Sequence, residues 1–320
     1  MANDQGLLSR GWSMVTHNKR YIIWFYLLNL TLAEFGASAF RNQAHAVLDH
    51  SLLSDRLLHG MDAGVLMEML IRPEFGPTMA SAMPALYMMF VFFALSAVFI
   101  PGVLQGYASN FRLPREDFFR ACGRNFWRFV RLLLIALIVF GIASGILFGI
   151  RGALIKAAGK NLNEVLPFYT SMIGLAVIFL VMSALRAWFD IAQADVVLND
   201  QRAVRKSIGT AFRHTMSHLG SLLTAYVFSA LIGLGIFAAG IWAWMTFVPP
   251  ASWLGAFFVS QFTLLLLLIP RFWQRAIAVS YYLKYMVEPI PVQSFAPAPS
   301  VASEPVPTVV PVASLGAQNS

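Results

Sequence analysis

Six long apolar runs constrain this chain more than any other feature. They cover residues 21–40, 85–104, 132–150, 168–185, 222–248 and 253–270, and only the first contains a charged side chain, that of Glu34. About 20 helical residues cross the hydrocarbon core of a bilayer, so runs of this length are suited to span it. The chain is only 12% charged, whereas soluble domains carry about 25% charged residues. We therefore predict an all-α integral membrane bundle of six transmembrane helices.

The distribution of Lys and Arg predicts how the spans are oriented. With the N-terminus in the cytoplasm, 17 of the 23 basic residues fall on the cytoplasmic side. The other six are Arg41, Arg56, Arg72, Arg151, Lys156 and Lys160. Because cytoplasmic loops carry an excess of Lys and Arg, this asymmetry predicts that both termini are cytoplasmic. The net charge of +8 then reflects loop bias and does not indicate nucleic-acid binding.

A corner motif recurs along the chain. Residues 182–219 read MSALRAWFDIAQADVVLNDQRAVRKSIGTAFRHTMSHL: a membrane exit, a turn and a basic amphipathic segment. Arg186 and Trp188 recur 85 residues later as Arg271 and Trp273. Gly123 and Phe126 recur 86 residues later as Gly209 and Phe212. Two landmarks with nearly the same period indicate an internal repeat.

We interpret the repeat as three quasi-repeated helical-hairpin units, at about residues 6–110, 111–200 and 201–286. Each unit would consist of a basic interfacial helix, a span out and a span back. Trp12 aligns with Phe126 at a longer shift of 114, and the surplus residues fall in an external insertion at 41–83. Its apolar spacing predicts two short amphipathic helices that lie over the outer mouth of the bundle or in the lipid headgroups. Residues 287–320, rich in Pro, Ala, Val and Ser, are predicted to be a disordered cytoplasmic tail.

Glu34 is the one acidic residue well inside a span. Charge at membrane depth is costly and usually faces protein or a water-filled cavity, so a role in moving protons or cations is one hypothesis. Asn29 and Gln261 are the nearest polar candidates to share its site. The structural alternative is a carboxyl group that is neutral or paired with Arg41, two turns along the same helix.

A second set of charged residues, Arg186, Asp190, Arg271 and Arg275, lies at cytoplasmic span ends. The repeat gives Asp190 and Arg275 equivalent positions with opposite charge, which favours an ion pair between units. The functional alternative is binding of anionic lipid headgroups by these arginines and by the basic segment 112–131. Snorkelling of arginine to the interface explains the same residues without any ligand.

Gly141, Gly145 and Gly149 form two overlapping GxxxG frames in the third run, which predicts close packing against another helix, more readily within the chain than in a homodimer. The chain contains no Walker loop, GxSxG elbow, paired catalytic carboxylates or nucleotide fingerprint. Its single cysteine, Cys122, excludes an intramolecular disulfide and a CxxC site. We therefore expect no enzymatic activity, no cofactor and no metal.

Three segments carry a family resemblance: GWSMVTHNKRYIIWFYLLNL, HSLLSDRLLHGMD and RAWFDIAQADVVLNDQRAVRKSIGTAFR. They resemble a group of uncharacterised bacterial polytopic membrane proteins over the chain to about Tyr285, which implies a multi-pass protein of the bacterial inner membrane. More loosely, the corner is similar to the membrane domain fused to some glycerophosphodiester phosphodiesterases. The phosphodiesterase domain is not expected in this chain, so its activity is not implied.

These observations favour a non-enzymatic inner-membrane protein that interacts with membrane lipids or organises other membrane proteins. The alternative hypothesis is a small-solute transporter or channel with Glu34 in a central cavity. The two hypotheses differ in what surrounds Glu34: a polar lumen favours transport, and a tightly packed apolar bundle argues against it.

Overall fold

The computed structural model describes residues 6–48, 64, 67, 71, 78–109, 113–160, 165–200, 203–249 and 252–287. The helices within these ranges are α1 (Leu7–His17), α2 (Arg20–Leu48), α5 (Thr78–Ala108), α6 (Arg115–Ala158), α7 (Leu166–Leu198), α8 (Val204–Ser217), α9 (Leu219–Phe247) and α10 (Trp253–Tyr285). The described residues form no strand, so the predicted all-α class is confirmed. Most of the external insertion and, apart from Val287, the tail lie outside the described residues.

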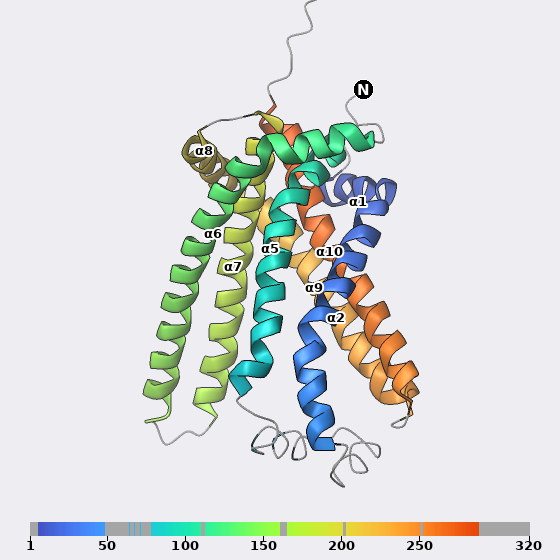
Figure 1. Cartoon of the computed structure of the whole chain (residues 1–320). Helices are drawn as coiled ribbons and strands as arrows, with labels where there is room; N and C mark the ends of the chain where they lie inside the picture. Colours follow the sequence, from blue (N-terminus) through green and yellow to red (C-terminus); the bar gives the residue numbers. More distant parts are fainter. Residues whose placement is uncertain are drawn as a thin grey trace, which may run out of the picture. The chain divides into compact units, whose positions relative to one another are not determined.

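Six of these helices, α2, α5, α6, α7, α9 and α10, are long and apolar enough to cross a membrane, which confirms the number of spans. Each is longer than the apolar run that predicted it, because polar and basic residues at the run ends continue the helix. The clearest case is α6, in which the basic segment before the third run and the run itself form one helix of 44 residues. Figure 1 shows the start of α6 lying across the neighbouring helices before the rest turns down beside α7.

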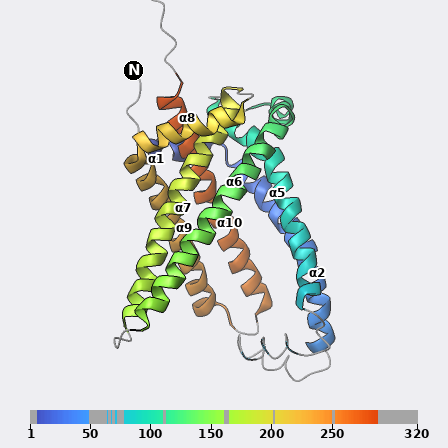
Figure 2. The same ribbon diagram turned by 90° about the vertical axis from the view of Figure 1, so that its left-hand side faces the viewer.

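The spans include three antiparallel pairs of consecutive helices, α2 with α5, α6 with α7, and α9 with α10, and α5 packs as extensively on α6 as on α2. In Figures 1 and 2 the first helix of each pair leaves the end of the bundle that carries α1 and α8, and the second helix returns to it. We call this end the α1/α8 end. The last residues of α2, α6 and α9 and the first residues of α5, α7 and α10 lie at the opposite end.

The buried core is concentrated toward the α1/α8 end. In α7 the buried positions run almost without a break from Ala187 to Val197, and in α10 they run from Phe272 to Tyr282. Toward the opposite end, large apolar side chains such as Ile146, Phe168 and Phe258 are exposed. An apolar exterior is expected of helices surrounded by lipid, because exposing these side chains to hydrocarbon costs little. The three pairs are therefore held together mainly at the α1/α8 end.

The short helices dock on spans of other pairs through tryptophan. The Trp273 indole N–H on α10 donates to Leu8 O on α1 over 3.0 Å, and the Trp12 and Trp273 rings meet edge to face at 5.1 Å. On α7, Trp188 donates to Ile208 O on α8 over 2.9 Å. Its ring meets that of Phe212 at 5.1 Å, again edge to face. Thus α1, which precedes the first pair, packs on the last pair, and α8, which precedes the third pair, packs on the second.

The start of α6 docks on α5 in a different way. A Cβ added at Gly102 of α5 would lie 2.6 Å from the Phe118 ring and 2.7 Å from Cys122 Sγ. The glycine therefore lets these two side chains rest directly on the α5 backbone. Close contact at Gly102 therefore joins α6 to α5, whereas tryptophan contacts join α1 and α8 to their spans.

The predicted packing role of the GxxxG residues within the chain is wrong. A Cβ added at Gly141, Gly145 or Gly149 would meet no atom of the described residues within 4 Å, and all three glycines are exposed. The part of α6 that packs inward is the face carrying Val139 and Phe140. Small residues permit close approach but do not determine which face of a helix turns inward, since side-chain fit along the whole interface does so.

Candidate functional site

The charged residues of α7 and α10 form one cluster near the α1/α8 end. Arg186 and Asp190 are four residues apart on α7, and Arg271 and Arg275 are four residues apart on α10. This spacing puts the members of each pair on one helix face. Because α7 and α10 pack against each other, four charged side chains gather at their junction. We call this group the α7–α10 cluster.

Asp190 is the buried member of the cluster. Its side chain is 10% exposed, and its Oδ2 lies 3.8 Å from the Nε atom of Arg186 on the same helix. The ion pair with Arg275 that the repeat suggested is absent among the described residues, although the charge of Arg275 acts on Asp190 from α10. A buried carboxylate is costly unless charges and hydrogen bonds compensate it. Asp190 obtains part of this compensation within its own helix and part from α9.

The α9 contribution comes from Tyr226, which is fully buried. Its hydroxyl oxygen lies 3.1 Å from Asp190 Oδ2 and 3.1 Å from Gln274 O, so its one proton can be donated to either acceptor. In return Gln274 Nε2 donates to Tyr226 O over 3.3 Å. Tyr226 therefore connects α7, α9 and α10. Tyr226 is not among the candidate residues predicted from the sequence. A tyrosine within an uncharged span was the available signal, since a buried tyrosine hydroxyl usually has a partner.

Positive charge exceeds negative charge in the α7–α10 cluster. Arg186, Arg271 and Arg275 are close enough for their charges to interact, and Asp190 is the carboxylate that acts on Arg275. Arg275 also lies over the Phe272 ring, with its guanidinium carbon 5.4 Å from the centroid. Three guanidinium groups against one carboxylate leave two positive charges without a carboxylate partner within the cluster. Arg271 is exposed and the Arg186 side chain is 40% exposed, so an external anion can reach them.

Two buried polar atoms beside the cluster have no hydrogen-bond partner among the described residues. They are the Tyr107 hydroxyl on α5, which lies near Arg275, and Gln274 Oε1. Most buried polar atoms in proteins have a partner, and an exception indicates a water molecule, an ion or a functional role. Polar groups of α5, α7, α9 and α10 therefore converge at a point with spare positive charge and spare hydrogen-bonding capacity.

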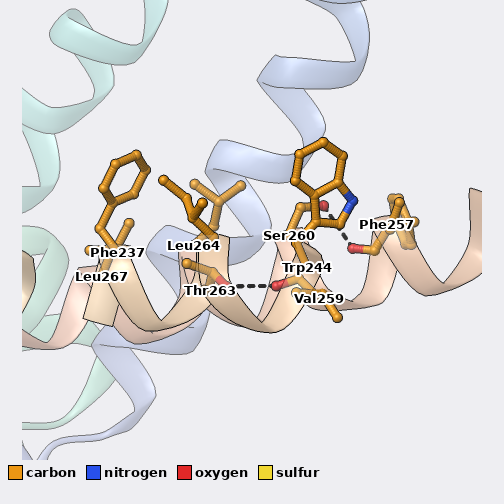
Figure 3. A pocket seen from close by; sticks show the side chains of 11 residues that line it. Phe237, Trp244, Phe257, Val259, Ser260, Thr263, Leu264 and Leu267 are labelled. Atoms are coloured by element: carbon orange, nitrogen blue, oxygen red, sulfur yellow. Dashed lines mark hydrogen bonds between the residues drawn. The ribbon is translucent and has the colours of Figure 1, made fainter. Parts of the chain in front are cut away.

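An apolar groove between α9 and α10 ends at Leu267, one helical turn before Arg271. Its volume is about 490 Å³, and its lining includes Phe237, Trp244, Phe257, Leu264 and Leu267 (Figure 3). The hydroxyls of Ser260 and Thr263 donate to carbonyls of their own helix, at 2.8 and 2.7 Å, so the groove offers an apolar surface. Leu267 precedes Arg271 by four residues and shares its helix face.

The sequence predicted one possible polar site from Glu34, Asn29, Arg41 and Gln261. In the structure, hydrogen bonds and ion pairs do not join these four residues to one another as a single site. Glu34 Oε1 lies 2.6 Å from Arg41 Nη1, and the two side chains are 65% and 52% exposed. Gln261 Oε1 instead accepts a hydrogen bond from Tyr26 over 3.1 Å, which ties α10 to α2. Asn29 is half-buried, and the described residues give it no side-chain hydrogen bond. The contact of Glu34 with Arg41 is the one that the structural alternative predicted.

Three of the five described arginines of the basic segment 112–131 form ion pairs with acidic residues. Arg124 and Arg128 form ion pairs with Asp200, in the turn between α7 and α8, and Arg120 pairs with Asp117 on the same helix. Arg128 also donates to Asp200 O over 3.2 Å. These contacts hold α6 against the α7–α8 turn, so this part of the segment has a structural role.

Comparison of the chain with protein-family models, curated proteins and solved structures finds no match in any of the three.

Proposed function

We propose that this multi-pass membrane protein is a non-enzymatic lipid-binding protein of the bacterial inner membrane, and that it holds an anionic lipid headgroup at the α7–α10 cluster. The observation that carries the proposal is the excess of arginine over carboxylate at the junction of three spans. Charged side chains within a membrane bundle are expensive and commonly mark a functional site. A phosphate group supplies the missing negative charge and accepts hydrogen bonds from guanidinium groups in a bidentate geometry.

The surroundings of the cluster suit a lipid better than a free anion. The apolar groove that ends one turn from Arg271 offers a surface for an acyl chain, and its volume lies within the range of about 300–1,000 Å³ typical of ligand pockets. A headgroup at Arg271 and a chain along α10 follow the direction in which a phospholipid lies in the bilayer. The paired, exposed state of Glu34 gives no comparable support to solute transport.

In this proposal both termini are cytoplasmic, so the cluster lies at the inner leaflet. The support is the excess of Lys and Arg on that side. The architecture is three helical-hairpin units related by an axis along the membrane normal. Its support is the pair of matching contacts, Trp273 with Leu8 and Trp188 with Ile208, together with the common direction of the three pairs.

Native mass spectrometry of the protein from mild detergent tests lipid binding. After delipidation and incubation with equal amounts of phosphatidylglycerol and phosphatidylcholine, the wild-type protein is expected to retain phosphatidylglycerol preferentially. Arg271→Gln, which alters an exposed residue, should lower the affinity of the cluster about tenfold, the effect of losing one charge-assisted hydrogen bond. Arg205→Gln on α8 is the matched surface control. Equal retention of both lipids by the wild type would contradict the proposal.

A further inference from the structure

A second groove lies between α2 and the start of α6, and it is made of two adjoining hollows. The hollow nearer the α1/α8 end, of about 220 Å³, includes Arg20, Leu113 and Arg115 in its lining. The other, of about 360 Å³, includes Leu27, Leu28, Thr31 and Phe99. Tyr21, Trp24 and Phe118 line both hollows, so the two form one continuous groove with a basic end and an apolar end. We call it the α2–α6 groove.

The floor of the α2–α6 groove is fixed by packing on α5. The Tyr21 and Phe118 rings stack with their centroids 5.5 Å apart. A Cβ at Gly106 would lie 2.3 Å from the Tyr21 hydroxyl, as one at Gly102 would meet Phe118, so both rings lie directly on the α5 backbone. A floor held in this way is already formed before a ligand arrives, which reduces the ordering cost of binding.

The basic end of the groove has unused hydrogen-bond donors. Arg20 uses one terminal nitrogen to donate to Leu113 O over 2.9 Å and to the Tyr21 hydroxyl over 3.1 Å, while its Nε is buried without a partner among the described residues. The Arg115 side chain has neither a hydrogen bond nor an ion pair with any described residue. On the same turn of α6, Asp117 pairs with Arg120 and Glu116 is exposed. Two guanidinium groups therefore face the same hollow.

The apolar end follows a single face of α2. Arg20, Trp24, Leu27, Leu28 and Thr31 are spaced by three and four residues, which aligns them along one side of the helix. From Arg20 to Thr31 the helix rises about 16 Å, close to the roughly 15 Å depth of one leaflet's hydrocarbon. The Thr31 hydroxyl donates to Leu27 O over 2.8 Å, so this residue adds no unpaired polar group to the surface.

We propose that the α2–α6 groove binds one anionic glycerophospholipid, with its phosphate between Arg20 and Arg115 and one acyl chain along Trp24, Leu28 and Thr31. The ligand is a lipid because the groove joins a cationic end at the predicted interface to an apolar stripe of one leaflet's depth. It is anionic because the guanidinium groups of Arg20 and Arg115 have spare donors and, among the described residues, no carboxylate partner. This inference extends the proposed lipid-binding function to a second site that shares no residue with the α7–α10 cluster.

The test is lipid stoichiometry and affinity measured on the full chain by native mass spectrometry, with phosphatidylglycerol as the probe and phosphatidylcholine as the competitor. Arg115→Gln removes an exposed charge that has no hydrogen bond or ion pair with the described part of the chain, and Thr31→Trp fills the apolar end while leaving both arginines in place. Each is expected to remove one of two retained phosphatidylglycerol molecules, or to weaken its binding about tenfold. Arg120→Gln, which alters the exposed and already paired arginine one turn further along α6, should change nothing.

Fluorescence identifies which site is affected. Phosphatidylglycerol with brominated acyl chains should quench Trp24, read as the difference between the wild type and Trp24→Phe. This quenching should be lost in Arg115→Gln and retained in Arg271→Gln. If Arg271→Gln binds as the wild type does while Arg115→Gln loses a lipid, the α2–α6 groove stands and the α7–α10 cluster fails. If Arg115→Gln and Thr31→Trp both keep wild-type stoichiometry, affinity and quenching, or if phosphatidylcholine occupies the groove equally well, the inference is overturned.

Discussion

The hydroxyl of Tyr226 on α9 lies 3.1 Å from the Asp190 carboxylate on α7, and both residues are buried. The contact joins two spans that belong to different helical pairs. The hydroxyl adds a hydrogen bond to a carboxylate whose ion pair with Arg186 is long, at 3.8 Å. The stability of the α1/α8 end and the charge available to a ligand therefore depend on the same small group of residues.

Tyr226→Phe is expected to destabilise the fold. The change removes one donor from a buried carboxylate and leaves the ring in place, at a cost of about 1–3 kcal/mol. The midpoint of thermal unfolding in mild detergent measures the effect. Tyr169→Phe, which removes the hydroxyl of a 60% exposed tyrosine, is the control and should leave the midpoint unchanged. Equal midpoints for the two variants would mean that the Tyr226 hydroxyl contributes nothing.

The two tryptophan contacts should act locally and independently. Trp273→Phe removes the bond to Leu8 O, so hydrogen exchange in α1 should rise about fivefold, as expected for loss of about 1 kcal/mol. Trp188→Phe removes the bond to Ile208 O and should produce the same change in α8. Each variant serves as the control for the other. A rise in both helices from either substitution would indicate general destabilisation instead.

Gly102→Ala should destabilise α5 packing by about 1–3 kcal/mol, because the new methyl group overlaps Phe118 and Cys122. Gly141→Ala offers a matched control in an open helix position and should be neutral or slightly stabilising. Thermal unfolding of both variants makes the comparison. Combining Gly102→Ala with Phe118→Ala should recover part of the loss, since the two side chains compete for one space.

The orientation of the spans can be measured with single cysteines. In a chain whose Cys122 is replaced by Ala, cysteine is introduced at the exposed Lys160 or at the exposed Lys206. An impermeant maleimide should label Lys160→Cys in spheroplasts and should label Lys206→Cys only after lysis, because the excess of basic residues places α8 in the cytoplasm. The reverse pattern would invert the orientation, and labelling of both sites in intact spheroplasts would rule out the six-span topology.

Glu34→Gln should have little effect. Exposed ion pairs contribute about 0–1 kcal/mol, and Arg41 lies near the helix end, where it can extend toward the interface. We expect an unfolding midpoint and a lipid stoichiometry equal to those of the wild type. Loss of a solute-dependent growth phenotype from a folded Glu34→Gln protein would instead revive the transporter hypothesis.

The sequence by itself determined the class of the fold, the number of spans and the apolar part of each span, but not how far each helix continues beyond it. This was possible because a segment in lipid must satisfy its backbone hydrogen bonds within its own helix, so length and apolarity suffice to identify it. The ion pair of Glu34 with Arg41 was likewise open to prediction, since both residues lie on one helix. Local spacing carries information of this kind.

Only the tertiary structure decided which face of each span turns inward. In lipid no hydrophobic force separates an inner from an outer face, because hydrocarbon surrounds an apolar helix whichever way it turns. The choice depends on the fit of side chains far apart in the chain. For that reason Gly141 lies exposed instead of packed, Tyr226 meets Asp190 although no local spacing pairs the two residues, and Arg20 and Arg115 line one groove.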